Sequence, residues 1–495
     1  MRKISVLLAG LFLASCNFGD SGNSDPAPDP LPVSIPSDIM GMVHAGDFEL
    51  LETMGVVWML SDFSWDGFEP APPTYREAMG GKSAGDRWKP ADGVTPAILA
   101  NLDHHWNENY KVDYLAGVAS HPSTRAFAVM AYDTPWIHPE GSSDNHVSAE
   151  MLPLYREQVK TMVKKLYRDV GVWNIWNEPD NRPRFWTGTD EEFYALTKTA
   201  ALAIREVETE LNVEHPDENI HLTITGGAFF SGASPEFIRG MFEYDKGIIK
   251  TTLDAVAFHP YSETPQSVTK AYNDFKAIVT PYGFGDKIWV TEEGYPSGGY
   301  YPWTITEAEL PEKVVKTLTL LATQGAGHIF WYHLFDSKKY ADATPQEKAD
   351  AEKWFGLVVN SKVDGKYVLK QGANAYALWA KYIPGYTYRP TLPKRSGLSA
   401  DIQSFYFEKD DGKRTLILWN DKDASLGVTV ILPGNSWLLH DPAEREFESA
   451  DGTNRLAPPA GIDSGGKAVI TLSKTPLILT WNAGADPLPP RISAP

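Results

Sequence analysis

Residues 172–179 read VWNIWNEP, and this short segment decides the fold. An apolar run ends here in an amide, a carboxylate and a proline, and residues 287–294, KIWVTEEG, repeat the pattern with two glutamates. Apolar runs without polar alternation are typical of parallel strands that are covered on both faces. In α/β barrels the catalytic side chains come from the carboxyl ends of such strands. The two segments therefore predict barrel strands that each end in a catalytic carboxylate.

Further apolar runs of the same kind alternate with amphipathic helices, such as the segments 152–170 and 190–211, between residues 38 and 384. This alternation predicts a (β/α)8 TIM barrel, with an open doubly wound sheet as the alternative. No Gly-rich turn of the dinucleotide-binding type follows the first run, which weakens that alternative. The eight predicted strands are 39–43, 56–60, 126–131, 172–176, 221–225, 253–258, 287–291 and 328–332.

The chain changes character after residue 384. Short alternating runs separated by turns follow, and the Asp411-Gly412 pair between two of them is a strong hairpin signal. Residues 385–485 are therefore predicted to form a β-sandwich. The Pro-rich stretch 486–495 is expected to be a loose tail.

The first residues indicate export. Arg2 and Lys3 precede the apolar stretch 4–14, which is too short to cross a bilayer and reads as a signal peptide over residues 1–15. Residues 13–16, LASC, resemble the lipobox of bacterial lipoproteins, which implies lipid attachment at Cys16, although an ordinary secretory signal is the alternative. Residues 16–37 are predicted to form a flexible tether. We expect a lipid-anchored, extracytoplasmic lipoprotein, with the outer membrane as the preferred destination.

Composition narrows the choice of partners. A formal net charge of −19 argues against a nucleic-acid partner, because binding phosphates needs a concentrated positive surface. Cys16 is the only cysteine, so no intramolecular disulfide forms. The 16 tryptophans and 22 tyrosines suit stacking on sugar rings, but they also fill ordinary cores.

Two carboxyl groups at one barrel mouth suit the cleavage of a glycosidic bond. One must be protonated to help the leaving group depart, while the other must be ionised to stabilise or attack the anomeric carbon. Retaining enzymes hold the two groups about 5–5.5 Å apart. Mutual repulsion at this distance raises the pKa of one of them.

The Trp-Asn-Glu-Pro and Val-Thr-Glu-x-Gly segments resemble the signatures of glycoside hydrolase clan A, in particular families 39 and 5. The resemblance implies that Glu178 is the general acid/base and Glu292 the nucleophile. Asn177 would bind the sugar 2-hydroxyl, Tyr261 would orient the nucleophile with His259 nearby, and Trp331 would form the floor under the cleaved sugar. The segment 132–136 resembles a wall of the same subsite, which adds Asp133 and Trp136 to the candidate substrate-binding residues.

Several alternatives stay open at the level of sequence. Glu293 competes with Glu292 for the nucleophile, but the register and the alternation of side chains along a strand favour Glu292. Tyr261, His259 and Trp331 could instead be core residues. Residues 103–105, Asp-His-His, lie in a predicted helix without a third spaced ligand, so no metal site is expected there. The clan's arginine near the end of the second strand is absent, because residues 58–62 read WMLSD.

The predicted function is that of a retaining glycoside hydrolase that cleaves a β-linked glycan by double displacement, without a metal or an organic cofactor. A transglycosylase would use the same residues, with a sugar acceptor in place of water. A non-catalytic glycan-binding lipoprotein on a decayed barrel is the third reading, which the missing arginine keeps open.

Overall fold

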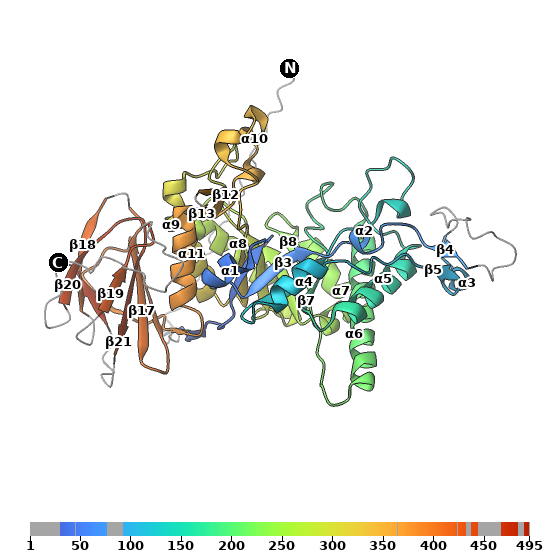
Figure 1. The fold of residues 1–495 in the computed structure, drawn as a ribbon. Coiled ribbons are helices and arrows are strands. Elements are labelled where there is room, and N and C mark those ends of the chain that lie inside the picture. Colours follow the sequence, from blue (N-terminus) through green and yellow to red (C-terminus); the bar gives the residue numbers. More distant parts are fainter. Residues whose placement is uncertain are drawn as a thin grey trace, which may run out of the picture.

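The computed structural model describes residues 30–44, 46–76, 93–363, 365–422, 424–431, 437–443, 467–483 and 490–494. Eight parallel strands close into a barrel in the order β10-β11-β2-β3-β6-β7-β8-β9. All eight predicted strands and the (β/α)8 TIM barrel are confirmed, and the open sheet is excluded (Figure 1). The barrel strands are β2 (Met40–Val43), β3 (Trp58–Asp62), β6 (Arg125–Met130), β7 (Val170–Ile175), β8 (Thr223–Phe230), β9 (Ala255–His259), β10 (Ile288–Glu293) and β11 (His328–Trp331).

Helices surround the barrel and cover the outer face of its strands, as Figure 1 shows. The long helix over residues 190–214 begins at Thr189, whose hydroxyl accepts from the amide of Glu192 while Glu192 reaches back to the amide of Thr189. The helices are α1 (Phe48–Thr53), α4 (Val112–Ala119), α5 (Leu152–Leu166), α6 (Asp190–Glu214), α7 (Pro235–Thr252), α8 (Pro265–Val279), α9 (Leu310–Thr323) and α11 (Gln371–Tyr382).

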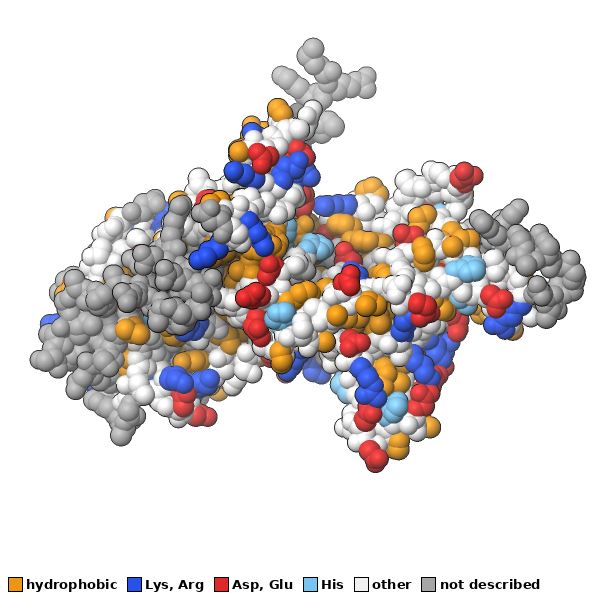
Figure 2. Space-filling view, in the orientation of Figure 1, with side chains coloured by type: hydrophobic (Ala, Val, Ile, Leu, Met, Phe, Trp, Pro, Cys, Tyr) orange, Lys and Arg blue, Asp and Glu red, His pale blue; other side chains and the backbone are white. Residues whose placement is uncertain are grey.

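A ladder of ion pairs joins α5 to α6, and Figure 2 shows basic and acidic side chains side by side in this region. Lys160 Nζ lies 2.6 Å from Glu206 and 2.9 Å from Glu210, and Lys164 Nζ lies 2.6 Å from Glu214. Side chains four residues apart share one helix face, so each lysine reaches the next glutamate along the neighbouring helix. A network of this kind fixes the register of the two helices more than it stabilises the fold.

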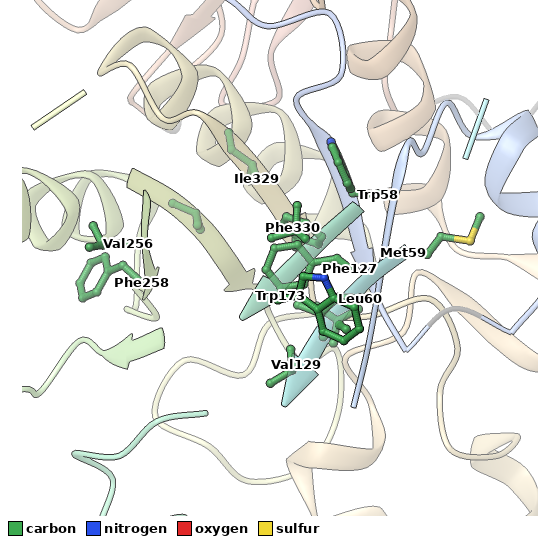
Figure 3. Close-up of a cluster of buried hydrophobic side chains, with 14 of the residues drawn as sticks. Trp58, Met59, Leu60, Phe127, Val129, Trp173, Val256, Phe258, Ile329 and Phe330 are labelled. Atoms are coloured by element: carbon green, nitrogen blue, oxygen red, sulfur yellow. The ribbon is translucent and has the colours of Figure 1, made fainter. Parts of the chain in front are cut away.

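Large apolar side chains fill the barrel (Figure 3). The rings of Phe127 and Phe330, from β6 and β11, lie 4.9 Å apart and are fully buried. A Cβ atom at Gly41 of β2 would lie 2.4 Å from the Phe330 ring, so the glycine makes room for that ring. The barrel is thus a packed core, and a substrate has access only at its mouth.

The C-terminal strands form two sheets, which confirms the predicted β-rich domain after the barrel. One sheet has the order β1-β14-β16-β17-β21-β19 and the other has the order β15-β22-β18-β20. Between them lies a separate apolar cluster that includes Leu416, Val430 and Leu479. The strands are β1 (Val33–Ser34), β14 (Thr387–Tyr388), β15 (Lys394–Ser396), β16 (Ile402–Glu408), β17 (Lys413–Asn420), β18 (Leu426–Ile431), β19 (Trp437–His440), β20 (Lys467–Leu472), β21 (Leu477–Asn482) and β22 (Arg491–Ser493).

Two segments that we expected to be loose carry strands of this domain. β1 lies within the predicted tether and pairs with β14, and β22 lies within the predicted Pro-rich tail and pairs with β15 and β18. Both are two or three residues long, and strands this short give little periodic signal in a sequence. The domain packs beside α9 and α11, where Lys316 Nζ lies 3.5 Å from Asp421.

Long insertions follow β3 and β11. The first contains α2 (Trp65–Phe68), β4 (Thr74–Tyr75), α3 (Pro96–Leu99) and β5 (Leu102–Asp103). Asp103 therefore lies in a strand paired with β4, and the predicted helix around it is wrong. The second contains the 3₁₀ turns η5 (Tyr340–Asp342) and η6 (Ala351–Lys353), α10 (Pro345–Ala349), β12 (Val358–Val363) and β13 (Lys366–Leu369).

A buried ion pair ties the second insertion to the barrel. Lys370 Nζ lies 2.7 Å from Asp336 Oδ1 and also donates to the Ser297 hydroxyl. Asp336 Oδ1 accepts a second hydrogen bond from the Gly356 amide. Both side chains are 5 % exposed, so neither charge has water to replace its partner. This pair fixes the loops that follow β10 and β11 at the barrel mouth.

No helix within the described ranges has the length and apolar character needed to cross a bilayer. The predicted signal peptide and Cys16 lie outside the described residues.

Candidate active site

A cavity of about 260 Å³ opens at the carboxyl ends of the barrel strands. Both predicted catalytic glutamates line it, together with aromatic and polar side chains from loops far apart in the sequence. The lining residues are His44, Asp62, Tyr132, Asn177, Glu178, Asn181, Arg184, Phe185, Phe230, Tyr261, Glu292, Tyr301, Trp303, Tyr332, Glu352 and Phe355.

A tight turn after β7 delivers Glu178 into the cavity. Trp176 and Glu178 have φ angles of 65° and 40°, in the left-handed region that residues with a Cβ atom rarely adopt. Hydrogen bonds hold this turn: the Glu178 amide donates to Ala228 O at 3.1 Å, and Asn174 Nδ2 donates to Trp176 O at 2.7 Å. The neighbouring strand thus compensates for the strain that aims this carboxyl group.

The end of β10 separates its two adjacent glutamates. Glu292 lines the cavity, whereas Glu293 is fully buried and is not part of the lining. Burial raises the pKa of Glu293 well above its ordinary value and so disfavours its ionised form. Of the two, only Glu292 is placed to meet a substrate.

His259, from the end of β9, lies between the two cavity glutamates. Its Nδ1 is 2.8 Å from Glu178 Oε1 and 3.7 Å from Glu292 Oε2, and its Nε2 is 3.0 Å from the Thr291 hydroxyl. Tyr261 donates to Glu292 Oε2 at 3.1 Å. Oxygen atoms of the two glutamates and a ring nitrogen of His259 all lie within 4.8 Å of one another.

The same three side chains form the one group in the described part of the chain that has the spacing to hold a metal ion. His259 Nδ1 contacts both glutamates, and Asn181 Nδ2 donates to Glu178 Oε2 at 2.7 Å.

The three groups perturb each other's protonation. Burial and repulsion from Glu178 raise the pKa of Glu292 to about 7, against the opposing effect of His259. Burial also acts to raise the pKa of Glu178, but the hydrogen bond and charge of His259, with Asn181 and Arg184, outweigh it and lower that pKa. Burial disfavours charge on His259, yet the two carboxylates outweigh it and raise the His259 pKa. The shifts of Glu178 and His259 both favour a charged pair across their 2.8 Å contact.

Of the other predicted substrate-binding residues, some line the cavity and others are buried outside it. Asn177 lines the cavity and donates to the Tyr132 hydroxyl at 3.1 Å. Trp331 is fully buried, so the prediction that it forms the sugar floor is wrong, and the next residue, Tyr332, lines the cavity instead. The reason is that β11 ends at Trp331, which faces the core beside Tyr295.

The segment after β6 that was predicted to form a wall of the site contributes a different residue than expected. Asp133 is buried and pairs with His138 at 2.6 Å, and Trp136 donates to the backbone of Glu69. Neither residue lines the cavity, so both support the wall from behind. Tyr132, which the sequence placed at the start of the same segment, is the residue that faces the site.

Sequence reasoning missed the residues of the rim. Arg184, 3.3 Å from Glu352, joins the loop after β7 to the insertion after β11, and its guanidinium lies 4.6 Å from the centre of the Phe185 ring. Tyr301 and Trp303, whose rings are 4.4 Å apart, come from the loop after β10. No short motif marks these loops, because their side chains meet only in the folded barrel.

Comparisons with known proteins agree with this geometry. Residues 153–278, which include Glu178 and His259, match the model of Glycosyl hydrolases family 39. This segment of the chain is similar to glycoside hydrolase family 39. The resemblance inferred from the sequence is thereby confirmed for the part of the barrel that carries the first glutamate.

Individual relatives match over different lengths. A stretch of 50 residues is 48% identical to a β-xylosidase of Caldicellulosiruptor saccharolyticus, and the match spans about a tenth of each chain. A family 39 glycoside hydrolase from Bacteroides cellulosilyticus WH2 superposes with a TM-score of 0.62 at 19% identity, over 90% of this chain and 81% of that one. A monomeric β-xylosidase from Caulobacter crescentus CB15 superposes with a TM-score of 0.56 at 10% identity, over 91% of this chain and 97% of that one. At these identities the two structures show a shared fold.

Proposed function

We propose that this protein is a retaining glycoside hydrolase that cleaves a β-linked glycan by double displacement. The observation that carries the proposal is the spacing of the cavity glutamates, whose closest oxygens lie within 4.8 Å. Retaining enzymes hold their carboxyl groups about 5–5.5 Å apart, whereas inverting enzymes need about 6.5–9.5 Å to admit a water molecule. The spacing favours direct attack by a carboxylate.

In the first step, Glu292 attacks the anomeric carbon while Glu178 donates a proton to the departing glycosidic oxygen. This forms a glycosyl ester on Glu292 and releases the leaving-group sugar. In the second step Glu178 takes a proton from water, which attacks the same carbon and releases Glu292. Tyr261 holds Glu292 through its hydroxyl, and Asn177 is placed beside the site to bind the sugar 2-hydroxyl.

His259 explains how Glu178 is supplied with its proton. When Glu292 is ionised, the proton that remains is shared across the 2.8 Å contact between His259 Nδ1 and Glu178 Oε1. A glycosidic oxygen bound beside Glu178 would favour the tautomer with the proton on the carboxyl group. The reactive form therefore needs Glu292 ionised and one proton kept on the His259–Glu178 pair.

The direct test is hydrolysis of a panel of aryl β-glycosides and polysaccharides, with aryl β-xylosides first because two relatives are β-xylosidases. We expect turnover with retention of anomeric configuration, followed by NMR, and its loss in Glu292→Gln. Inversion, or equal behaviour of wild type and Glu292→Gln on every substrate, would contradict the proposal.

The same panel separates the two alternatives. A transglycosylase would form new glycosides when a sugar acceptor is added and would release little free sugar. A glycan-binding protein would bind but turn over none of the substrates. The geometry of Glu178, His259 and Glu292 favours catalysis over mere binding, because the two carboxyl groups face one cavity at a spacing that suits a retaining mechanism.

We also propose that Cys16 carries a lipid that holds the enzyme on the extracytoplasmic side of a bacterial membrane. The support is the LASC segment that follows the short apolar stretch near the N-terminus.

A further inference from the structure

Asp62 ends β3, at the place where the sequence analysis found no arginine, and lines the cavity. Among the described residues its carboxylate has no hydrogen-bond or ion-pair partner. The ionisable groups that face it are His44, from the loop after β2, Lys111, which precedes α4, and Glu292. Lys111 Nζ donates a hydrogen bond to the Ser61 hydroxyl at 2.9 Å.

A half-buried carboxylate without donors is costly, because burial removes water that nothing in the protein replaces. Burial accordingly raises the pKa of Asp62, although His44 and Lys111 act to lower it. A ligand that brings hydroxyl donors would remove this cost. Because each sugar hydroxyl donates one hydrogen bond, the two oxygens of one carboxylate suit two adjacent hydroxyls.

The barrel order determines which part of a sugar would meet Asp62. β2 and β3 lie between β10, which carries Glu292, and β7, which precedes Glu178, while β8 and β9 close the other side. A ring whose anomeric carbon lies between the two glutamates has the ends of β11, β2, β3 and β6 on one side, where its remaining hydroxyls can reach Asp62. His44 lies there too, and its ring packs against Tyr332, 5.8 Å away.

We propose that Asp62, assisted by His44, determines specificity by binding two adjacent hydroxyls of the sugar that is cleaved, and so selects a neutral sugar over a uronic acid. The inference rests on the proposed function. A sugar carboxylate in this corner would face Asp62, in a cavity that Glu292 and Glu178 also line. Arg184 and His259 lie beside Glu178 instead, and like charges brought together at Asp62 are strongly disfavoured.

The test couples enzyme variants to substrate deletions. Wild type, Asp62→Ala and Asp62→Asn are assayed on a neutral aryl β-glycoside and on its monodeoxy analogues. A charge-assisted hydrogen bond predicts a loss of kcat/KM of about ten- to a hundredfold in Asp62→Ala on the parent substrate. On the deoxy analogue that lacks the bound hydroxyl, the same substitution should cost less than about threefold. The exposed Asp66→Asn, in α2 outside the cavity, is the matched control and should change nothing.

A second comparison uses charge. Wild type should prefer the neutral glycoside to the matching uronide by about a hundredfold or more, and Asp62→Asn should reduce that preference at least tenfold. The assignment of Asp62 would be overturned if Asp62→Ala lost the same factor in kcat/KM on every deoxy analogue. It would also be overturned if Asp62→Asn kept the wild-type preference for the neutral glycoside. If wild type hydrolyses the neutral glycoside in that case, the proposed function still stands. If wild type hydrolyses no glycoside at all, the proposed function fails with it.

Discussion

The hydroxyl of Tyr261 contributes to the pH at which Glu292, the proposed nucleophile, becomes ionised. It donates to Glu292 Oε2 at 3.1 Å, and burial raises the Tyr261 pKa well above its ordinary value, so the hydroxyl stays a donor across the working range. Hydrogen bonds to charged groups contribute about 1.5–3 kcal/mol. The 3.1 Å separation is longer than the 2.5–2.7 Å typical of such bonds, which favours the lower end of that range.

Tyr261→Phe should therefore raise the pKa of Glu292, which is about 7 in the intact site, by about one pH unit. Because the nucleophile must be ionised, the acid limb of kcat/KM against pH moves to higher pH by the same amount, and activity below that limb falls about tenfold. The other groups that face Glu292, namely His259, Glu178 and Asp62, are unchanged by the substitution.

The assay is kcat/KM for an activated aryl glycoside between about pH 4 and 9, since this ratio reports the pKa values of the free enzyme. Tyr132→Phe is the control, because the Tyr132 hydroxyl lies in the same cavity but bonds to Asn177 rather than Glu292. Its acid limb should stay in place. An acid limb that does not move in Tyr261→Phe, or that moves to lower pH, would refute the role given to this hydrogen bond.

Three further predictions concern the acid, the fold and the anchor. Glu178→Ala should lose about 10²–10⁴-fold in kcat on glycosides with poor leaving groups but little in the first step on activated aryl glycosides, as measured by burst kinetics; equal losses on both would contradict its role as the acid. Lys370→Met should lower the free energy of unfolding by about 3–5 kcal/mol in a denaturant titration, because Asp336 would be left buried without its partner; a change below about 1 kcal/mol would show that water reaches Asp336. Cys16→Ser should release the protein from the membrane fraction and abolish labelling by a fatty-acid analogue; retention of both would contradict lipid attachment at this residue.

The sequence predicted those features that depend on short, continuous segments of the chain. The eight barrel strands and the positions of Glu178 and Glu292 at strand ends follow from apolar runs and from one motif on each of two strands. A buried parallel strand has to be apolar along its length, so its pattern is strong. By contrast, β1 and β22 are too short to show any period.

The site beyond the two glutamates depends on details that a motif does not specify. The prediction of Trp331 as the floor failed by one residue, because the point at which β11 ends decides whether Trp331 or Tyr332 faces the cavity. Asp62 was noticed only as the place of a missing arginine, and its lack of a partner became visible only in three dimensions. Arg184 and Glu352 are 168 residues apart in the chain, so no local pattern joins them.

The central claim, that Glu292 attacks the sugar, is tested most directly by trapping the enzyme with an activated 2-deoxy-2-fluoro β-glycoside and mapping the labelled peptide by mass spectrometry. The account predicts a stoichiometric glycosyl ester on Glu292, with no label in Glu292→Gln. Label on Glu293, which the structure buries behind the cavity wall, or on Glu178 would contradict it.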